Sequence, residues 1–293
     1  MTSVEDWTIG RLLEWTSDYL RDQGSQSARL DAEVLLAKAR NCTRIELYTA
    51  YKESADPQLR QQYRNLVQQR AKGMPVAYLV GEKEFYSLPF YVSPHVLIPR
   101  PETEFIVLRL LDLVRELPQG QDSVRIADLG TGSGILAVCA AKYVSKCQIV
   151  AVDQSQEALA VAQANVTRHE VADRVTLKRS DWFDGLSDEP LFDFVISNPP
   201  YVSQDELEQL EPDVRDFEPH MALVSGTDGA SDTEKIIAQT PNHLAAGGWL
   251  ILETSPMLAS RFERQLKSSE AFDEVKVEID LSRQPRILIA RRK

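Results

Sequence analysis

The sequence predicts an α/β fold in which helices cover both faces of a mostly parallel, seven-stranded sheet, with a helical domain ahead of it. Three observations support this prediction. From Val124 onward, short apolar strand patterns alternate with helical ones, which is typical of parallel sheets. A glycine-rich segment, residues 130–134, directly follows the first of these strands. Residues 7 to about 72 show apolar residues at helical spacing only.

The predicted strands and helices of the sheet domain follow one another in chain order. The seven strands are expected at residues 125–129, 148–153, 174–178, 194–196, 249–253, 273–280 and 286–290. Helices are expected at residues 105–117, 135–143 and 156–168. A further helix before the fifth strand is expected to begin with a capping box formed by Ser231 and Glu234. The last two strands are expected to form an antiparallel pair at the sheet edge.

The chain ahead of the sheet predicts a separate helical domain and a connector. Thr43 and Glu46 form a predicted capping box, and a polar helix is expected over residues 59–69. Residues 84–92 suggest a β-hairpin with its turn at residues 87–89. We therefore expect a helical domain at residues 1–82, a β-hairpin linker at 83–97 and the sheet domain at 98–293.

The composition restricts the class of protein. The 293 residues carry a net charge of −11 without a basic stripe, which argues against a protein that holds nucleic acid mainly through its phosphates. Cys42, Cys139 and Cys147 are scattered and suit a reducing cytosol, and four histidines without ligand spacing predict no metal site. No apolar run reaches membrane-spanning length, and the N-terminus lacks a signal-peptide pattern. A cytoplasmic protein without membrane contact is expected.

The fourth predicted strand stops at Asn198-Pro199-Pro200-Tyr201. Two consecutive prolines cannot continue a sheet, because each lacks an N–H group and has a fixed φ. Asn198 is therefore held at the end of a strand, with its side-chain amide beside backbone carbonyls. These acceptors suit an NH2 group of a substrate. The alternative interpretation is a Pro-Pro turn that only closes the strand.

The glycine-rich segment lies between two carboxylates. Its glycines let the backbone turn tightly and approach a ligand, but their spacing differs from the dinucleotide pattern, so NAD is disfavoured. Asp153 ends the next strand, where a carboxylate can accept ribose hydroxyls. Asp128 adds negative charge where a cationic ligand would lie, or only bonds to the loop. The candidate cofactor-binding residues of this segment are Asp128, Gly130, Thr131, Gly132, Ser133, Gly134 and Asp153.

The third and fourth strand ends complete the predicted site. Asp181 offers a hydrogen-bond acceptor, and Trp182 offers an aromatic face for an adenine ring. Ligands in open α/β sheets bind outside the carboxyl ends of the strands. The glycine loop, the ribose acceptor, the adenine contact and the Asn198 amide are therefore expected at one site.

The order of these motifs resembles that of class I S-adenosylmethionine-dependent methyltransferases, which have a Rossmann-like sheet. Asn198-Pro199-Pro200-Tyr201 is similar to the motif of enzymes that methylate planar NH2 groups of adenine or glutamine. Residues 97–104, with Phe217-Glu218-Pro219 and Ala222-Leu223, further resemble the HemK/PrmC family. That family methylates the glutamine of the Gly-Gly-Gln loop in peptide-chain release factors. The resemblance covers nearly the whole chain, including the helical domain, which in that family recognises the release factor.

The resemblance implies a cofactor, a substrate and roles for the motif. The cofactor would be S-adenosyl-L-methionine, with S-adenosyl-L-homocysteine as product, and the substrate a class I release factor methylated at the glutamine side-chain nitrogen (N5). Asn198 and the Pro199 carbonyl would accept the two amide protons, and Tyr201 would pack against the flat amide, or only in the core. Pro200 and Arg100 would contact the substrate. The neighbouring Pro99 and Pro101 restrict the backbone on both sides of Arg100. A monomer without direct nucleic-acid binding is expected.

Other functions remain open from the sequence. Residues 205–218 carry seven carboxylates and one arginine, which indicates either a solvated face or an acidic rim for a basic partner. The alternatives within the enzyme class are a glutamine methyltransferase of a ribosomal protein and an N6-adenine nucleic-acid methyltransferase, and the latter would need a basic cleft and a base-flipping pocket. A non-catalytic cofactor-binding module is the alternative outside that class.

Overall fold

The computed structural model describes residues 7–117 and 123–293, which form two compact units. One unit comprises residues up to Glu82 together with Glu211–Phe217, and the other comprises Lys83–Leu210 and Glu218–Lys293. In the described chain, no helix combines the length and the apolar character needed to cross a membrane. Nor do the same residues include a group of three or more His, Cys, Asp or Glu side chains arranged to hold a metal ion.

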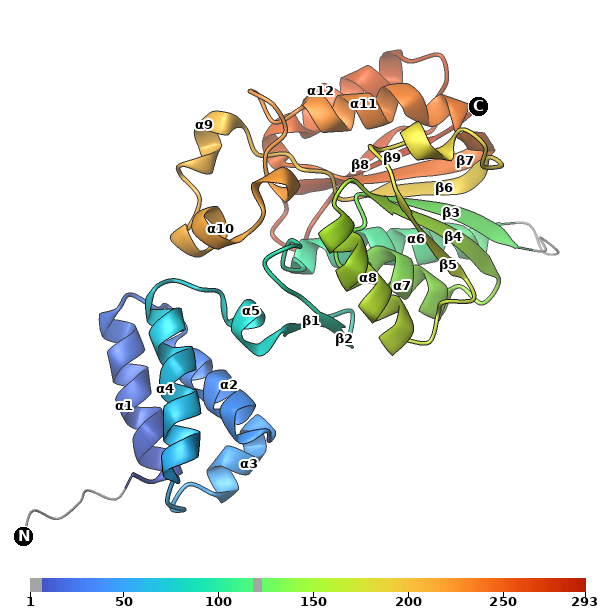
Figure 1. Cartoon of the computed structure of the whole chain (residues 1–293). Helices are drawn as coiled ribbons and strands as arrows, with labels where there is room; N and C mark the ends of the chain where they lie inside the picture. The colour runs from blue at the N-terminus through green and yellow to red at the C-terminus, as the bar shows by residue number, and fades with distance from the viewer. Residues whose placement is uncertain (1–6, 118–122) are drawn as a thin grey trace, which may run out of the picture. The chain divides into compact units, whose positions relative to one another are not determined.

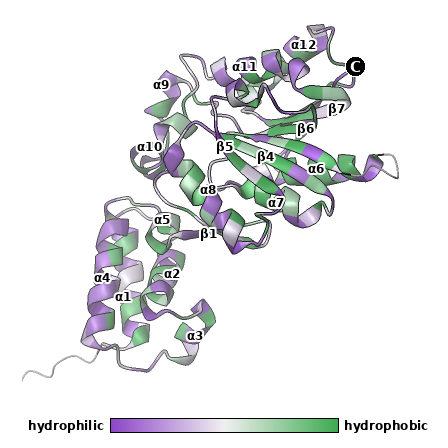
Figure 2. Ribbon diagram, turned by 45° about the vertical axis from the view of Figure 1, so that its right-hand side comes forward, coloured by the Kyte–Doolittle hydropathy of each residue, from purple (hydrophilic) through white to green (hydrophobic). Residues whose placement is uncertain are grey.

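The smaller unit is built from helices that enclose their own core (Figure 1). Up to Glu82, its helices are α1 (Ile9–Asp22), α2 (Ala28–Arg40), α3 (Arg44–Thr49), α4 (Pro57–Ala71) and α5 (Val76–Val80). Most leucines of α1 and α2, among them Leu13 and Leu36, are buried, as the helical spacing predicted, whereas Leu30 is exposed. In contrast, α4 is largely hydrophilic in Figure 2 and buries only Tyr63 and Val67. The helix α5, five residues long, was not predicted from the sequence.

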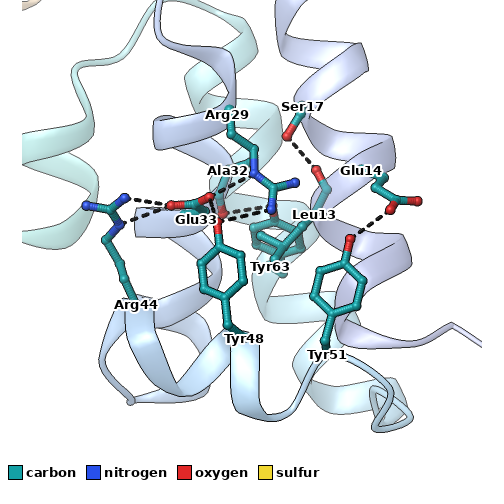
Figure 3. A network of polar contacts seen from close by, with 10 residues as sticks. All are labelled: Leu13, Glu14, Ser17, Arg29, Ala32, Glu33, Arg44, Tyr48, Tyr51 and Tyr63. Carbon is teal, nitrogen blue, oxygen red and sulfur yellow. Dashed lines mark hydrogen bonds and ion pairs between the residues drawn. The ribbon is translucent and has the colours of Figure 1, made fainter.

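A polar network around Glu33 joins α2 and α3 of this unit (Figure 3). The Glu33 carboxylate on α2 accepts hydrogen bonds from Arg29 Nε at 2.8 Å, from Arg44 Nη2 at 2.6 Å and from the Tyr48 hydroxyl. The Glu33 side chain is only 3% exposed, so these bonds replace water around a buried charge. The predicted capping box of Thr43 and Glu46 at the start of α3 is confirmed.

A two-stranded hairpin precedes the sheet of the larger unit. It consists of β1 (Glu82–Phe85) and β2 (Leu88–Tyr91), so the predicted hairpin is confirmed, but the predicted position of its turn is wrong. Tyr86 and Ser87 make the turn with φ values of 50° and 59°, and residues 88–89 already belong to β2. Two central residues with positive φ are the geometry that matches the twist of a two-residue hairpin.

The sheet of the larger unit has seven strands in the order β5-β4-β3-β6-β7-β9-β8 (Figure 1). Its strands are β3 (Val124–Leu129), β4 (Cys147–Asp153), β5 (Val175–Arg179), β6 (Phe192–Ser197), β7 (Leu244–Glu253), β8 (Lys276–Ile279) and β9 (Pro285–Arg291). The first five pair in parallel, whereas β9 pairs antiparallel with both β7 and β8. The predicted fold class and the antiparallel pair at the sheet edge are therefore confirmed.

Helices cover both faces of this sheet (Figure 1). The helices α6 (Glu104–Glu116), α7 (Ile135–Tyr143) and α8 (Gln156–Arg168) pack on one face, and α11 (Ser231–Gln239) and α12 (Pro256–Ser268) pack on the other. Neighbouring strand residues alternate between the two cores: Ile126 belongs to the first and Ala127 to the second. Figure 2 shows β6 as largely hydrophobic, as expected for a strand buried on both faces.

Short elements occupy the connections between the longer helices and strands. They are η1 (Pro101–Thr103), η2 (Asp184–Leu186), α9 (Gln204–Leu207), α10 (Pro212–Phe217), η3 (His220–Ala222) and η4 (Thr240–Asn242). The predicted capping box at α11 is wrong, because Ser231 is already the first helical residue and Glu234 pairs with Arg261 at 2.6 Å. Instead, Ser225 Oγ accepts the hydrogen bond from the Asp232 backbone N–H at 2.8 Å.

Candidate active site

A cavity of about 400 Å³ lies at the carboxyl ends of β3, β4, β5 and β6 in the larger unit. This size is in the range of small-molecule and cofactor sites. The cavity brings together Arg100, Gly130, Thr131, Gly132, Ser133, Asp153, Asp181, Trp182, Asn198 and Pro200 of the predicted site residues. Asp128, Gly134, Pro199 and Tyr201 do not line it. The last three are each next in the chain to a lining residue, and Asp128 accepts a hydrogen bond from the lining residue Thr131.

The loop after β3 takes a shape that glycine makes possible. Gly130 and Gly134 have φ values of 68° and 82°, in the left-handed region. A Cβ atom at Gly134 would lie 3.3 Å from Ala162 of α8, and one at Gly130 would lie 3.2 Å from the Trp182 ring. The glycines therefore allow both the turn itself and close packing of the loop against its neighbours.

Asp153 holds the loop through backbone hydrogen bonds. Its Oδ2 accepts from the Gly132 N–H and its Oδ1 from the Ser155 N–H, each at 2.9 Å. Burial raises the pKa of Asp153, and these two N–H groups counter the rise. Because a carboxylate oxygen can accept more than one hydrogen bond, Asp153 retains acceptor capacity toward the cavity that it lines.

Asp128 is completely buried at the end of β3. Its Oδ2 accepts from Thr131 Oγ1 at 2.6 Å and from the Ala137 N–H at 3.1 Å. Its Oδ1 is buried and has no hydrogen-bond partner in the described chain. Burial raises the pKa of Asp128 to about 7, against the two hydrogen bonds that favour the carboxylate. Asp128 can therefore be neutral or ionised near pH 7. This geometry is compatible with both interpretations from the sequence, a carboxyl group that only bonds to the loop and a negative charge near a cationic ligand.

Trp182 forms one wall of the cavity. It adopts a left-handed backbone conformation with φ 47°, which is uncommon for a bulky residue. Its indole Nε1 donates to Asp232 Oδ1 at 3.1 Å, so α11 holds the ring in place. Asp232 was not predicted as a site residue, because it lies fifty positions further along the chain and belongs to no motif.

The Asn198-Pro199-Pro200-Tyr201 motif follows directly after β6. Ser197 Oγ donates to the Leu129 carbonyl at 2.6 Å, which ties the end of β6 to the end of β3. Asn198 Nδ2 donates to Thr103 Oγ1 at 3.1 Å, and the Tyr201 hydroxyl contacts Glu253 Oε1 at 3.4 Å. The side chains at both ends of the motif are thus held by residues from other elements.

Thr103 and Glu253 were not predicted as site residues. Thr103 Oγ1 donates to Glu253 Oε2 at 2.7 Å, and both residues are 1% exposed. Burial raises the pKa of Glu253 to about 7, whereas the Thr103 hydrogen bond lowers it. A signal was available in the sequence, since Glu253 ends the strand beside the one that leads to Asn198.

Arg100 lies at the cavity and is oriented by a buried carboxylate. Its Nη2 bonds to Glu218 Oε1 at 2.6 Å, while Glu218 Oε2 accepts from the Ile98 N–H at 3.1 Å. The Glu218 side chain is 1% exposed. The end of the acidic segment is therefore not a solvated face, and Glu218 holds Arg100 instead.

The chain matches two family models and curated relatives along most of its length. The models are the PrmC N-terminal domain, at residues 11–81, and the methyltransferase small domain, at residues 110–211. A protein from Rhodopirellula baltica is 45% identical over 282 residues, which cover 96% of this chain and 95% of the relative. One from Geobacter sulfurreducens is 42% identical, with 85% and 84% covered, and one from Escherichia coli K12 is 39% identical, with 79% and 80% covered. All three are named release factor glutamine methyltransferase.

Solved structures support the fold independently. The human Mettl16 catalytic domain, solved with an RNA hairpin, matches with a TM-score of 0.58 and 16% identity over 78% of this chain and 82% of that one. A methyltransferase from Pyrococcus furiosus matches with a TM-score of 0.51 and 20% identity over 79% and 98%. These matches agree with the fold, and the identity to the curated relatives confirms the resemblance that the motifs indicated. The chain belongs to the release factor glutamine methyltransferase family.

Proposed function

We propose that this protein transfers a methyl group from S-adenosylmethionine to the side-chain amide nitrogen of the glutamine in the Gly-Gly-Gln motif of class I release factors. The observation that carries the proposal is the position of Asn198 on the wall of the cavity, next to the glycine loop and Asp153. The names of the relatives agree with this activity and favour neither a ribosomal protein nor adenine as substrate. Release factors act in translation, so the proposal places the enzyme in the cytoplasm.

The cavity residues fit S-adenosylmethionine. Asp153 would accept the ribose hydroxyls, and Asp181 and Trp182 would bind the adenine ring. The glycine loop would let the backbone approach the ligand; its residues are Gly130, Thr131, Gly132, Ser133 and Gly134. Asp128 would place a negative charge near the cationic part of the ligand. The acceptor capacity that Asp153 retains toward the cavity supports this assignment of the cavity, because Asp153 lines it and can accept hydrogen bonds from a ligand. When bound, the cofactor supplies a methyl group activated by the positive sulfur, and S-adenosyl-L-homocysteine is the product.

The motif at Asn198 would orient the substrate amide. An amide nitrogen is a poor nucleophile because its lone pair is delocalised. If Asn198 Oδ1 and the Pro199 carbonyl accept its two N–H groups, the lone pair points at the methyl carbon and the nitrogen can become pyramidal. Such preorganised acceptors lower the barrier by positioning and electrostatics, without a strong base. Pro200 and Tyr201 would flank the flat amide, although only Pro200 lines the cavity in this structure.

Recognition of the rest of the release factor is assigned to other parts of the chain. We propose that the helical domain at residues 1–82 recognises the partner, that residues 83–97 are the linker and that residues 98–293 carry the chemistry. The match of the PrmC N-terminal domain to residues 11–81 supports this division. Arg100, held by Glu218 beside the cavity, would contact the peptide near the glutamine.

The decisive experiment is methyl transfer from labelled S-adenosylmethionine to a purified class I release factor. A matched sample carries the same release factor with the glutamine of its Gly-Gly-Gln loop replaced by alanine. Label on the first sample and none on the second is expected, and it establishes both substrate and position. Equal label on both would refute the position. No label on either, with cofactor binding intact, would refute the substrate, and ribosomal proteins and then adenine in nucleic acid would be tested next.

A further inference from the structure

We propose that Thr103 and Glu253 are positioning residues that fix which way round the Asn198 amide faces, so that its oxygen is the atom presented to the substrate. The inference rests on the proposed function, because it concerns the group that would accept the N–H of the glutamine. It is carried by a chain of three polar side chains from three separate elements. Glu253 ends β7, Thr103 ends η1, and Asn198 follows β6.

The order of donors and acceptors begins at Glu253. An ionised carboxylate has no hydrogen to donate, so the 2.7 Å contact with Thr103 Oγ1 uses the hydroxyl hydrogen of Thr103. Both residues are 1% exposed, so bulk water does not compete for this hydrogen. The Thr103 oxygen is then left with acceptor capacity only.

The direction of the Asn198 amide follows from this. With its own hydrogen committed to Glu253, Thr103 can only accept from Asn198, and the 3.1 Å contact is made by Asn198 Nδ2. Nδ2 is thereby directed at Thr103, and Oδ1 is left for a partner in the cavity that both Asn198 and Thr103 line. A reversed amide would present hydrogens to the hydrogens of the substrate NH2 group, which is a repulsive arrangement.

Glu253 also reaches the other end of the motif. Its second oxygen, Oε1, lies 3.4 Å from the Tyr201 hydroxyl, which can donate to it. One buried carboxylate thus contacts Tyr201 directly and Asn198 through Thr103. This arrangement couples the position of the whole Asn-Pro-Pro-Tyr turn to the protonation state of one group.

The charged groups that face Glu253 determine when it is ionised. Burial raises the pKa of Glu253 to about 7. Among the charged neighbours, Arg286 of β9 lowers this pKa and Glu102 of η1 raises it. The hydrogen bonds from Thr103 and Tyr201 also favour the carboxylate. Above that pH, the carboxylate enforces the order described here. Below it, Glu253 carries a hydrogen that it can donate to Thr103, and Thr103 can then donate to Asn198 Oδ1. Turnover should therefore rise as the pH increases through about 7.

The first test compares turnover in four variants at saturating cofactor and release factor. Thr103→Val keeps the shape of threonine but removes the hydroxyl, and we expect kcat to fall about tenfold to a hundredfold, as when a reacting group is misplaced. Thr103→Ser keeps the hydroxyl and should stay within about threefold of wild type on the same reasoning. Glu253→Gln should lower kcat and abolish the rise near pH 7. The matched control is Thr233→Val, which removes a fully buried hydroxyl that has no hydrogen-bond partner in the described chain.

Wild-type turnover with Thr103→Val, or a pH dependence that survives in a folded Glu253→Gln enzyme, would overturn the proposal. A second measurement does not need turnover. The side-chain NH2 resonances of Asn198, identified by their absence in Asn198→Ala, should shift with a midpoint near pH 7 in wild type and stay constant in Glu253→Gln. If wild type methylates no release factor, the proposed function fails and these resonances still decide the positioning role. If they do not move in wild type, the positioning role fails and the proposed function stands.

Discussion

The indole Nε1 of Trp182, three residues beyond β5, donates to Oδ1 of Asp232 in the first turn of α11, 3.1 Å away. Asp232 is itself held by the hydrogen bond from its backbone N–H to Ser225 Oγ at 2.8 Å. Trp182 has an unfavourable positive φ, and its ring lies against Gly130. The wall of the cavity thus depends on a residue of α11 that orients the ring.

Asp232→Ala is expected to weaken cofactor binding more than it slows turnover. Loss of one hydrogen bond of about 0.5–1.5 kcal/mol leaves the Trp182 ring free to move, so the Kd for S-adenosylmethionine should rise about threefold to tenfold. At saturating cofactor, kcat should stay close to wild type. Isothermal titration calorimetry and steady-state kinetics measure the two effects. Asp188→Ala, which removes an exposed carboxylate that does not line the cavity, serves as control. An unchanged Kd in Asp232→Ala would show that the ring needs no such support.

Asp128→Asn is expected to stabilise the cofactor-free protein at pH 8 and to weaken cofactor binding. The folded-state pKa of about 7 lies above the ordinary value of 3.8, so the folded state binds the proton more tightly. Stability therefore falls as the pH rises from about 4 to 7, by up to about 4 kcal/mol for such a shift. Asparagine is neutral and avoids this loss, but it gives up part of the bonding at Thr131 and Ala137. We expect a net gain of about 1–3 kcal/mol at pH 8 and a smaller gain at pH 5.

Urea unfolding at the two pH values and calorimetric titration of the cofactor test this trade-off. The cofactor is cationic, so removal of the carboxylate should raise its Kd at least about tenfold. A variant that is less stable than wild type at pH 8 would mean that the two hydrogen bonds outweigh the cost of the buried charge.

For the two helices next to the glycine loop, the predicted first and last residues agree with the structure. The helix α7 (Ile135–Tyr143) begins after Gly134 and α8 (Gln156–Arg168) after a Ser155 cap, so local signals fix their starts. Where such signals are weak, the prediction was less accurate. The strand β7 starts at Leu244 rather than Trp249, because glycines 247 and 248 interrupt the apolar pattern.

The contacts that orient site residues were not predictable in the same way. Glu253 reaches Thr103 across 150 positions of the chain, and Asp232 reaches Trp182 across 50. Such contacts depend on which strands become neighbours in the sheet and on how the loops cross their ends. Residue patterns report the strand ends themselves, which is why Asp153, Trp182 and Asn198 could be placed around one cavity from the sequence.

Glu33→Ala is expected to destabilise the helical unit. Burial alone would raise the pKa of Glu33, but hydrogen bonds from Tyr48, Arg44 and Arg29 together hold it below its ordinary value. A lowered carboxylate pKa means that this stabilisation is present above the usual pH of titration and is lost as the pH falls. Since both arginines are partly exposed, the loss should be about 1–3 kcal/mol at pH 7 rather than the value of a fully buried pair.

Amide hydrogen exchange in α2 measures this loss without interference from the sheet. Glu14→Ala is a matched control, because Glu14 bonds Tyr51 at an exposed position and its removal should have a much smaller effect (Figure 3). Equal effects of the two substitutions would mean that the burial of Glu33 adds nothing to its contribution.

Asn198→Ala should separate chemistry from cofactor binding. The proposed mechanism gives Asn198 the task of accepting an N–H of the substrate, a role that matters most in the transition state. Removal of one such preorganised group typically lowers kcat about 100-fold to 1,000-fold. The cofactor contacts assigned to Asp153 and Trp182 lie on other strand ends, so the Kd for S-adenosylmethionine should stay within about threefold of wild type.

Single-turnover methyl transfer measures the rate and calorimetry measures the Kd for the cofactor, both on the same Asn198→Ala preparation. The control for the loss of an amide is Asn242→Ala, at an exposed position that does not line the cavity. A collapse of cofactor binding with little change in the rate at saturation would contradict the assignment. Asn198 would then be a cofactor ligand, and orientation of the glutamine would have to come from the Pro199 carbonyl and the neighbouring loops. A fall in kcat at constant Kd would instead show that the Asn198 amide acts on the substrate, because its removal would then slow methyl transfer without changing the affinity for the cofactor.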